Sequence, residues 1–146
     1  MTSTHNWDAW KKYIHTAANI LAGAETQLQK LYKLTLSDFD VLVTLYTAPE
    51  RQLSMKSLKA NVLVTTSGLS RAVTRMEERG WVTKHTDEND KRAVILKLSA
   101  AGAAAFEEIG PVHRAYVRNI FFDALSAKDQ EALGVALTHL QDHLDR

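Results

Sequence analysis

Hydrophobic residues recur every three or four positions along the first thirty residues of the chain. From residue 6 to residue 31 they form one heptad-like stripe, which predicts a single long helix. The stripe consists of Trp7, Trp10, Ile14, Ala17, Leu21, Ala24, Leu28 and Leu31. One small domain cannot cover a stripe of this length, so we expect part of it to pack against another helix, from this chain or from a second subunit.

Three shorter helices are predicted next. Thr35 with Asp38 three residues later forms a capping-box pattern, and Pro49 marks where that helix has ended. Ser54 begins a short helix, and Thr65 is predicted to cap the one that follows. A helix, a tight connection and a second helix are the parts of a helix-turn-helix.

The helix after Thr65 has two distinct faces. Leu69, Ala72, Val73 and Met76 form its buried stripe, and Gly80 supplies the left-handed position that ends it. The opposite face is small, polar and basic. It carries Ser67, Ser70, Arg71 and Thr74, with Arg75 on the flank.

A small sheet and two further helices complete the pattern. Residues 81–86 and 93–98 are predicted to be short strands joined by the polar loop 87–92, which has the layout of a wing. Ser99 caps a long helix, and Ser126 with Asp129 opens a last one.

The predicted fold is mainly α with a small β-wing. We expect a single chain over residues 1–146, in which a winged helix-turn-helix lobe spans residues 34–98. The flanking helices, at residues 6–31 and 99–146, have more apolar surface than that lobe requires and are predicted to form a homodimer.

Composition removes several classes of function. The chain of 146 residues has no cysteine, which excludes disulfides, thiolate zinc sites and thiol-based redox sensing. No uninterrupted apolar run approaches the length of a membrane span, and the first residues lack the basic region of a signal peptide. The expectation is a cytoplasmic protein with no membrane partner.

Charge is distributed unevenly around a net charge of +1. Residues 51–92 carry nine Lys or Arg against five Asp or Glu, whereas the rest of the chain carries nine against twelve. A basic centre suits a module that faces phosphate, although many such segments are only solvated surface.

The outer face of the fourth predicted helix has the chemistry needed to read DNA. Short polar groups let the backbone approach base edges, and one long donor reaches guanine; Ser67, Gly68, Ser70 and Arg71 meet both requirements. Thr65 and Thr66 are placed to dock a phosphate at the helix start. On the wing, Arg92 is long enough to enter a minor groove, and Asp90 is expected to hold its guanidinium in a bidentate pair. The full predicted set of DNA contacts is Thr65, Thr66, Ser67, Gly68, Ser70, Arg71, Thr74, Arg75, Asp90 and Arg92.

These motifs together resemble the MarR (multiple antibiotic resistance regulator) family. The run from Leu69 to Gly80, then Asp90-x-Arg92 and Leu98-Ser99-x-x-Gly102, is similar to that family's recognition helix, wing and following helix, with Ser99 in place of the usual Thr. The resemblance implies a homodimer that binds double-stranded DNA at a pseudo-palindromic operator. It also implies a repressor relieved by a small phenolic or other anionic ligand. Ser67, Ser70 and Arg71 match recognition positions, and Asp90 and Arg92 match the wing pair.

The signal that such a regulator senses is less well specified. Trp10, His15 and Tyr46 are candidates to line a ligand pocket, although aromatic residues at these spacings are more often core. His139 and His143 lie one helical turn apart, but no third or fourth zinc ligand stands at a recognisable spacing. We therefore predict no metal site and no cofactor, with a zinc-responsive regulator as the alternative.

Two alternatives belong to other classes of function. A phosphate-binding glycine loop, a nucleophile elbow and a zinc-protease motif are all missing from the sequence, which argues against an enzyme. A winged helix that binds protein instead of DNA would not need the basic outer face formed by Arg71 and Arg92.

Overall fold

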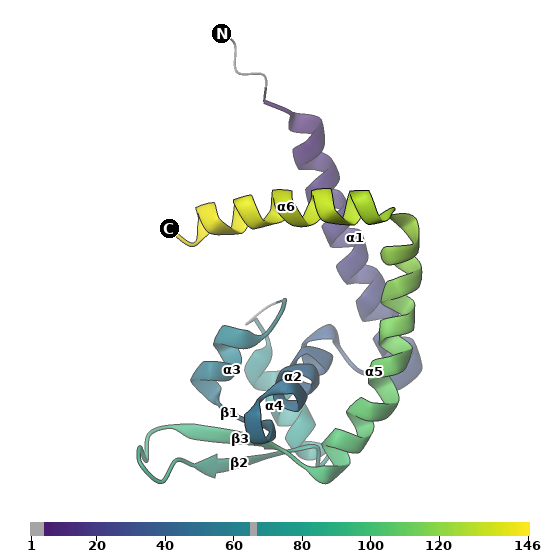
Figure 1. Cartoon of the computed structure of the whole chain (residues 1–146). Coiled ribbons are helices and arrows are strands. Elements are labelled where there is room, and N and C mark those ends of the chain that lie inside the picture. The colour runs from purple at the N-terminus through teal and green to yellow at the C-terminus, as the bar shows by residue number, and fades with distance from the viewer. Residues whose placement is uncertain (1–4, 65–66) are drawn as a thin grey trace. The chain divides into compact units, whose positions relative to one another are not determined.

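A computed structural model describes residues 5–64 and 67–146 of the chain. Thr65 and Thr66 lie outside the described residues. The elements in chain order are α1 (Trp7–Tyr32), α2 (Leu36–Thr47), η1 (Pro49–Arg51), β1 (Gln52–Ser54), α3 (Met55–Asn61), α4 (Leu69–Glu78), β2 (Val82–Thr86), β3 (Val94–Leu98), α5 (Ala100–Ile120), η2 (Phe122–Ala124) and α6 (Ala127–Leu144) (Figure 1). They divide into two compact units, Met1–Pro111 and Val112–Arg146.

The helix starts follow the predicted caps in α2, α3 and α6. Thr35 Oγ1 accepts from the Asp38 amide at 3.0 Å, and Asp38 Oδ2 accepts from the Thr35 amide at 3.0 Å, so the predicted capping box is present. Ser54 and Ser126 each accept the amide hydrogen bond expected of an N-cap. These short polar side chains satisfy amides that the first helical turn leaves without partners.

The core of the first unit lies around α2. Apolar side chains from the end of α1, from α2, α3 and α4, from the sheet and from the start of α5 meet there and exclude water. The fully buried members are Leu28, Leu34, Val41, Leu42, Leu45, Leu58, Leu69, Ala72, Val73, Met76, Val82 and Leu96. The α4 face predicted to be buried is therefore confirmed, and its opposite face is turned to solvent.

Three antiparallel strands form the sheet, in the order β1-β3-β2. The sequence pattern predicted β2 and β3 but missed β1. This strand of three residues pairs with β3, with Leu53 opposite Leu96. At the base of the hairpin, α5 passes so close that a Cβ added at Gly102 would lie 2.3 Å from the Trp81 carbonyl oxygen. Ser99 caps this turn, because its hydroxyl oxygen accepts from the Gly102 amide at 3.0 Å.

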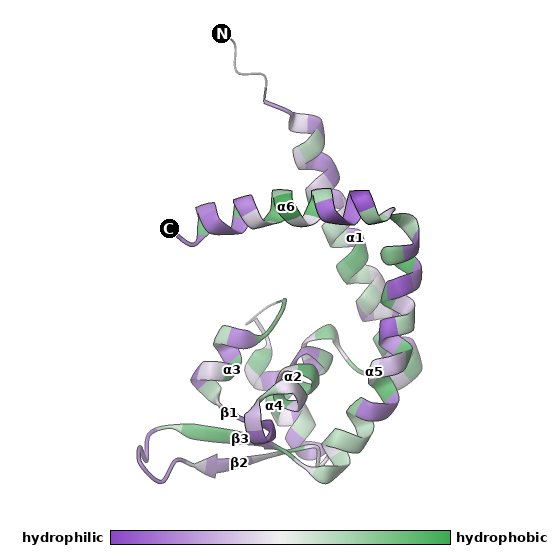
Figure 2. Cartoon of the chain, in the orientation of Figure 1, coloured by the Kyte–Doolittle hydropathy of each residue, from purple (hydrophilic) through white to green (hydrophobic). Residues whose placement is uncertain are grey.

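Much of α1 presents apolar side chains to solvent. Ala24 and Leu28 are buried near its end, but Trp7 and Trp10 are 65% and 57% exposed in the single chain. In the second unit, Leu140 and Leu144 of α6 are also exposed. Figure 2 shows hydrophobic and hydrophilic positions interspersed along both helices. Over the described part of the chain, every helix is too short or too polar to cross a membrane.

Candidate nucleic-acid interface

The outward face of α4 is a shallow, open groove. Its volume is about 360 Å³, and Ser70, Arg71, Thr74, Arg75 and Glu78 line it. Most of these side chains stand on the stripe opposite the buried face of α4. The structure thus brings four of the predicted DNA contacts together on one helix and adds Glu78, an acid that the sequence analysis did not single out.

The start of α4 differs from the prediction. The N-cap is Gly68, with φ +76°, and its carbonyl oxygen accepts from the Ala72 amide at 3.0 Å; Thr65 as the N-cap is therefore wrong. The physical reason is the left-handed backbone at Gly68, which a glycine adopts without strain and which breaks helical geometry before Leu69. Ser67 and Gly68 consequently precede the helix, and Thr65 and Thr66 fall outside the described residues.

A buried ion pair holds α4 against α2. Asp38 is 1% exposed, and its Oδ1 lies 2.9 Å from Nε and 2.7 Å from Nη2 of Arg75. The same Nη2 donates to Thr35 Oγ1 at 3.3 Å. A buried carboxylate is costly without a partner, so Arg75 neutralises it and completes the α2 cap. Arg75, which the helical periodicity of the sequence predicted to lie beside the DNA-contacting face, thus also has a structural role that the sequence pattern did not reveal.

The end of α4 is tied to the junction of α1 and α2. Arg79 Nη2 donates to the Lys33 carbonyl at 2.9 Å, and the Arg79 guanidinium lies 4.9 Å from the centre of the Trp81 ring. Lys33 itself adopts a left-handed conformation, with φ +56°, and caps α1 by donating to the Gln29 carbonyl at 3.0 Å. Arg75 and Arg79 therefore fix α4 at its middle and just beyond its end.

The wing tip is held differently from the prediction. Asp90 Oδ1 accepts from the backbone amide of Arg92 at 3.0 Å, whereas the Arg92 Nε lies 4.0 Å away, so the predicted bidentate pair is absent. The Asp90 carboxylate instead forms a local turn with the amide two residues later. The Arg92 side chain is 98% exposed and extends into solvent.

The three predicted ligand contacts have separate surroundings. Tyr46 packs on Phe106 at 4.4 Å between ring centres, donates to Glu107 Oε1 at 3.0 Å and lies under Arg51. Trp10 borders a hollow of about 200 Å³ near the start of α1, and His15 is exposed on the same helix.

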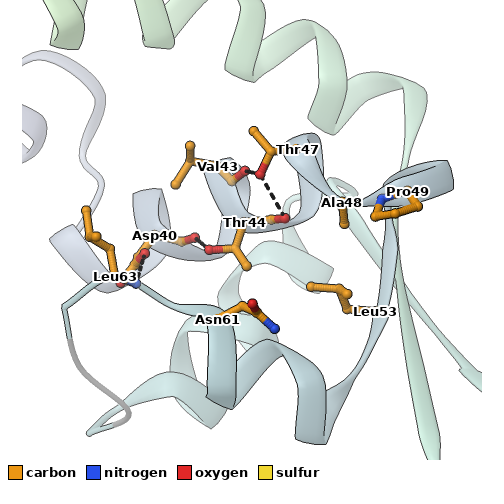
Figure 3. A pocket seen from close by; sticks show the side chains of 9 residues that line it. All are labelled: Asp40, Val43, Thr44, Thr47, Ala48, Pro49, Leu53, Asn61 and Leu63. Atoms are coloured by element: carbon orange, nitrogen blue, oxygen red, sulfur yellow. Dashed lines mark hydrogen bonds between the residues drawn. The ribbon is translucent and has the colours of Figure 1, made fainter. Parts of the chain in front are cut away.

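A larger cavity lies on another face of α2. It has a volume of about 390 Å³, and none of the three predicted ligand residues lines it (Figure 3). The lining residues are Asp40, Val43, Thr44, Thr47, Ala48, Pro49, Leu53, Asn61 and Leu63. His139 and His143 are exposed on α6, and the described residues include no group of three or more His, Cys, Asp or Glu side chains that could hold a metal ion.

A helix with an exposed basic face, set after a turn and followed by a hairpin with an exposed arginine at its tip, defines a winged helix-turn-helix DNA-binding protein.

Comparison with known proteins supplies the family. Residues 32–93 match the model of the MarR family. An uncharacterized HTH-type transcriptional regulator of Bacillus cereus is 31% identical over 117 residues, which cover 80% of this chain and 76% of the relative. Sco3205, a MarR family transcriptional regulator from Streptomyces coelicolor solved in complex with DNA, matches with a TM-score of 0.87 at 30% identity, covering 94% of this chain and 86% of its own. AbsC, a MarR family regulator from the same organism, matches with a TM-score of 0.87 at 29% identity, covering 99% and 97%. The chain belongs to the MarR family and is a DNA-binding transcriptional regulator, not an enzyme.

Proposed function

We propose that this regulator is a homodimeric repressor that reads a pseudo-palindromic operator and is released by a small organic anion. The observation that carries the DNA-reading part is the pairing of two exposed arginines on one lobe, Arg71 on the outward face of α4 and Arg92 at the wing tip. The relative Sco3205, of the same fold, was solved with DNA bound.

In this proposal α4 reads the major groove and the wing reads the minor groove. Ser67, Gly68, Ser70 and Thr74 let the backbone approach base edges, and Arg71 donates to guanine. Arg92 enters the narrow groove beside it. Thr65 and Thr66 are proposed to contact phosphate, and Arg75 to approach the backbone from its position beside Asp38.

Substitution of Arg71 tests the DNA-reading proposal. Arg71→Ala should weaken binding to a duplex selected by the wild-type protein by about 1–3 kcal/mol and relax the base preference at one position in each half-site. Lys128→Ala on α6 removes the same charge from an exposed site and serves as the control. Binding of Arg71→Ala that matches wild type would refute α4 as the reading helix.

The homodimer proposal rests on the exposed apolar side chains of α1, including Trp7, Trp10 and Ile14. A second copy would bury surface that a single chain leaves in water. Two lobes held this way would contact half-sites about 10 bp apart. Sedimentation at micromolar concentration should give a dimer, and Trp10→Glu should shift it toward monomer. A monomeric wild-type protein would contradict the proposal.

The proposed effector is an aromatic or phenolic anion that contacts Trp10, His15 or Tyr46. A ligand that prefers a dimer with wrongly spaced recognition helices lowers operator affinity by the difference in its affinity for the two states. Millimolar salicylate should therefore weaken operator binding, and Tyr46→Ala should blunt the response. Loss of DNA binding with micromolar zinc, abolished by His139→Ala, would instead support a metal-responsive regulator.

A further inference from the structure

Asp40 of α2 is a buried acid that the DNA-reading proposal does not use. Its side chain is 3% exposed, and its two carboxylate oxygens accept from two consecutive backbone amides 23 and 24 residues away. Oδ1 accepts from the Leu63 amide at 2.8 Å, and Oδ2 accepts from the Val64 amide at 3.0 Å. Figure 3 shows the Asp40 carboxylate directed at Leu63.

The segment that these bonds hold connects α3 to α4. Val62, its first residue, packs partly buried against the core, but Leu63 is 85% exposed and Val64 is also exposed, so these two side chains anchor it little. Burial of apolar surface, which fixes α4 through Leu69 and Met76, is thus not what fixes Leu63 and Val64. Hydrogen bonds from amides to an ionised acceptor are stronger than neutral ones and can take over that task.

The surroundings of Asp40 make its role specific. The carboxylate borders the 390 Å³ cavity of α2, so the space beside it is not filled by packed side chains. Thr44 and Thr47 line the same cavity, but their hydroxyls donate to backbone carbonyls within α2, Thr44 to Asp40 O at 2.6 Å and Thr47 to Val43 O at 2.8 Å. These hydroxyls are thus occupied within the helix, whereas the Asp40 carboxylate reaches across to the Leu63 and Val64 amides.

We propose that Asp40 is a positioning residue for DNA recognition, which holds the α3–α4 connection so that the residues at the start of α4 meet the operator in one fixed geometry. The proposal rests on α4 being the reading helix. Preorganisation of this kind lowers the entropy cost of ordering the connection when DNA binds. It matters for sequence-specific contacts, which need geometry, and much less for non-specific binding, which needs only charge.

The experiment compares two DNA affinities for each variant. The probes are a duplex selected from a random pool by the wild-type protein and a scrambled duplex of the same composition, at one salt concentration. Asp40→Ala should bind the selected duplex about tenfold to a hundredfold more weakly, while its affinity for the scrambled duplex stays within about twofold. Asp40→Asn, which keeps one acceptor oxygen, should lie between. Thr47→Ala, on the same cavity wall, is the matched control and should bind both duplexes like wild type.

Amide hydrogen exchange gives a readout without DNA. The Leu63 and Val64 amides should lose protection in Asp40→Ala, whereas amides in the middle of α2 should keep theirs. Equal losses of affinity for both duplexes would show that Asp40 only stabilises the fold and would overturn the proposal. The proposal would also be overturned if Asp40→Ala bound the selected duplex as tightly as wild type while Arg71→Ala bound it more weakly. If Arg71→Ala also binds like wild type, the reading helix itself is wrong.

Discussion

The helix α4 and the wing are both proposed to touch DNA, but the protein holds them in opposite ways. The helix is fixed by a buried face, by the Asp38–Arg75 pair and by the Arg79 bond to the α1–α2 junction. The wing tip is fixed by short-range hydrogen bonds within residues 87–93, among them the turn at Asp90, and the Arg92 side chain is 98% exposed.

This difference separates two tasks. Reading base edges in the major groove requires donors at set positions, so a helix with a fixed orientation loses little entropy on binding. Insertion into a minor groove requires a positive charge that can adjust to a groove of variable width. A long, exposed side chain can make that adjustment without being positioned beforehand. Substitution of an α4 side chain that contacts the rest of the fold, such as Arg75, should therefore affect folding as well as binding. Substitution of the exposed Arg71 or of a wing-tip residue should affect binding alone.

The largest effect is expected at Arg75. Arg75→Ala leaves the buried Asp38 carboxylate without its cation, and we expect the free energy of unfolding to fall by about 2–4 kcal/mol, less than for a fully buried pair because Arg75 is part exposed. Urea unfolding at fixed protein concentration measures it. Arg71→Ala, on the same helix but outside this pair, is the control and should stay within about 0.5 kcal/mol of wild type. Equal stabilities for the two variants would show that the Asp38–Arg75 pair does not hold α4 in place.

Arg92→Ala should give the next largest effect, and in binding only. We expect operator affinity to fall by about 1–3 kcal/mol with unfolding unchanged, because the side chain packs against nothing in the folded lobe. Fluorescence anisotropy with a labelled duplex would measure the affinity. Lys91→Ala, the exposed neighbour, controls for loss of charge at the tip. A drop in stability as large as that in binding would mean that the wing tip is packed after all.

Asp90 allows a finer test of how the tip is held. Asp90→Ala removes the acceptor for the Arg92 amide, and a loss of about 0.5–1 kcal/mol in operator affinity is expected. Asp90→Asn keeps an acceptor oxygen and removes a negative charge near phosphate, so it should bind as well as wild type or better. If Asp90→Asn is as weak as Asp90→Ala, the charge matters and the turn does not.

The smallest effect concerns His113 in α5, which is part of neither region. Burial lowers the pKa of His113 below its usual 6.5, so the unfolded chain takes up a proton at this side chain before the folded protein does. The His113 contribution is therefore neutral above pH 6.5 and becomes destabilising as the pH falls below it. Urea unfolding at pH 7.5 and 5.5 should show a smaller decrease for His113→Phe than for wild type. If His113→Phe and wild type show the same pH dependence, His113 is protonated as readily in the folded protein as in the unfolded chain.

Local signals in the sequence predicted the elements well. The Thr35–Asp38 capping box, the Ser54 and Ser126 caps and the left-handed Gly80 act within three or four residues, and such short-range chemistry is legible in a linear pattern. The exception was Thr65, where a good capping residue lost to a glycine three positions later. A cap preference is worth about 1 kcal/mol, and the left-handed turn at Gly68 outweighs it.

The candidate site was only partly visible in the sequence. The face of α4 and the wing arginine followed from periodicity, but the partners of Asp38 and Asp40 lie 23 to 37 residues away in the chain. The sequence pattern assigned Asp38 a capping role alone and assigned Asp40 no role, because nothing local marks an acid that the fold will bury. The strand β1, three residues long, was missed for a similar reason, since its pairing with β3 is a long-range contact.

The Lys33 carbonyl, which accepts from Arg79, has a consequence for protein engineering. It joins the end of α1 to the end of α4 at a tight left-handed turn, with no flexible spacer between α1 and α2. We therefore expect a rotation imposed at the N-terminal end of α1 to reach α4, the proposed reading helix. If a designed coiled coil is fused in register ahead of Trp7, a change in the pitch of that coiled coil should change the affinity of the protein for its operator.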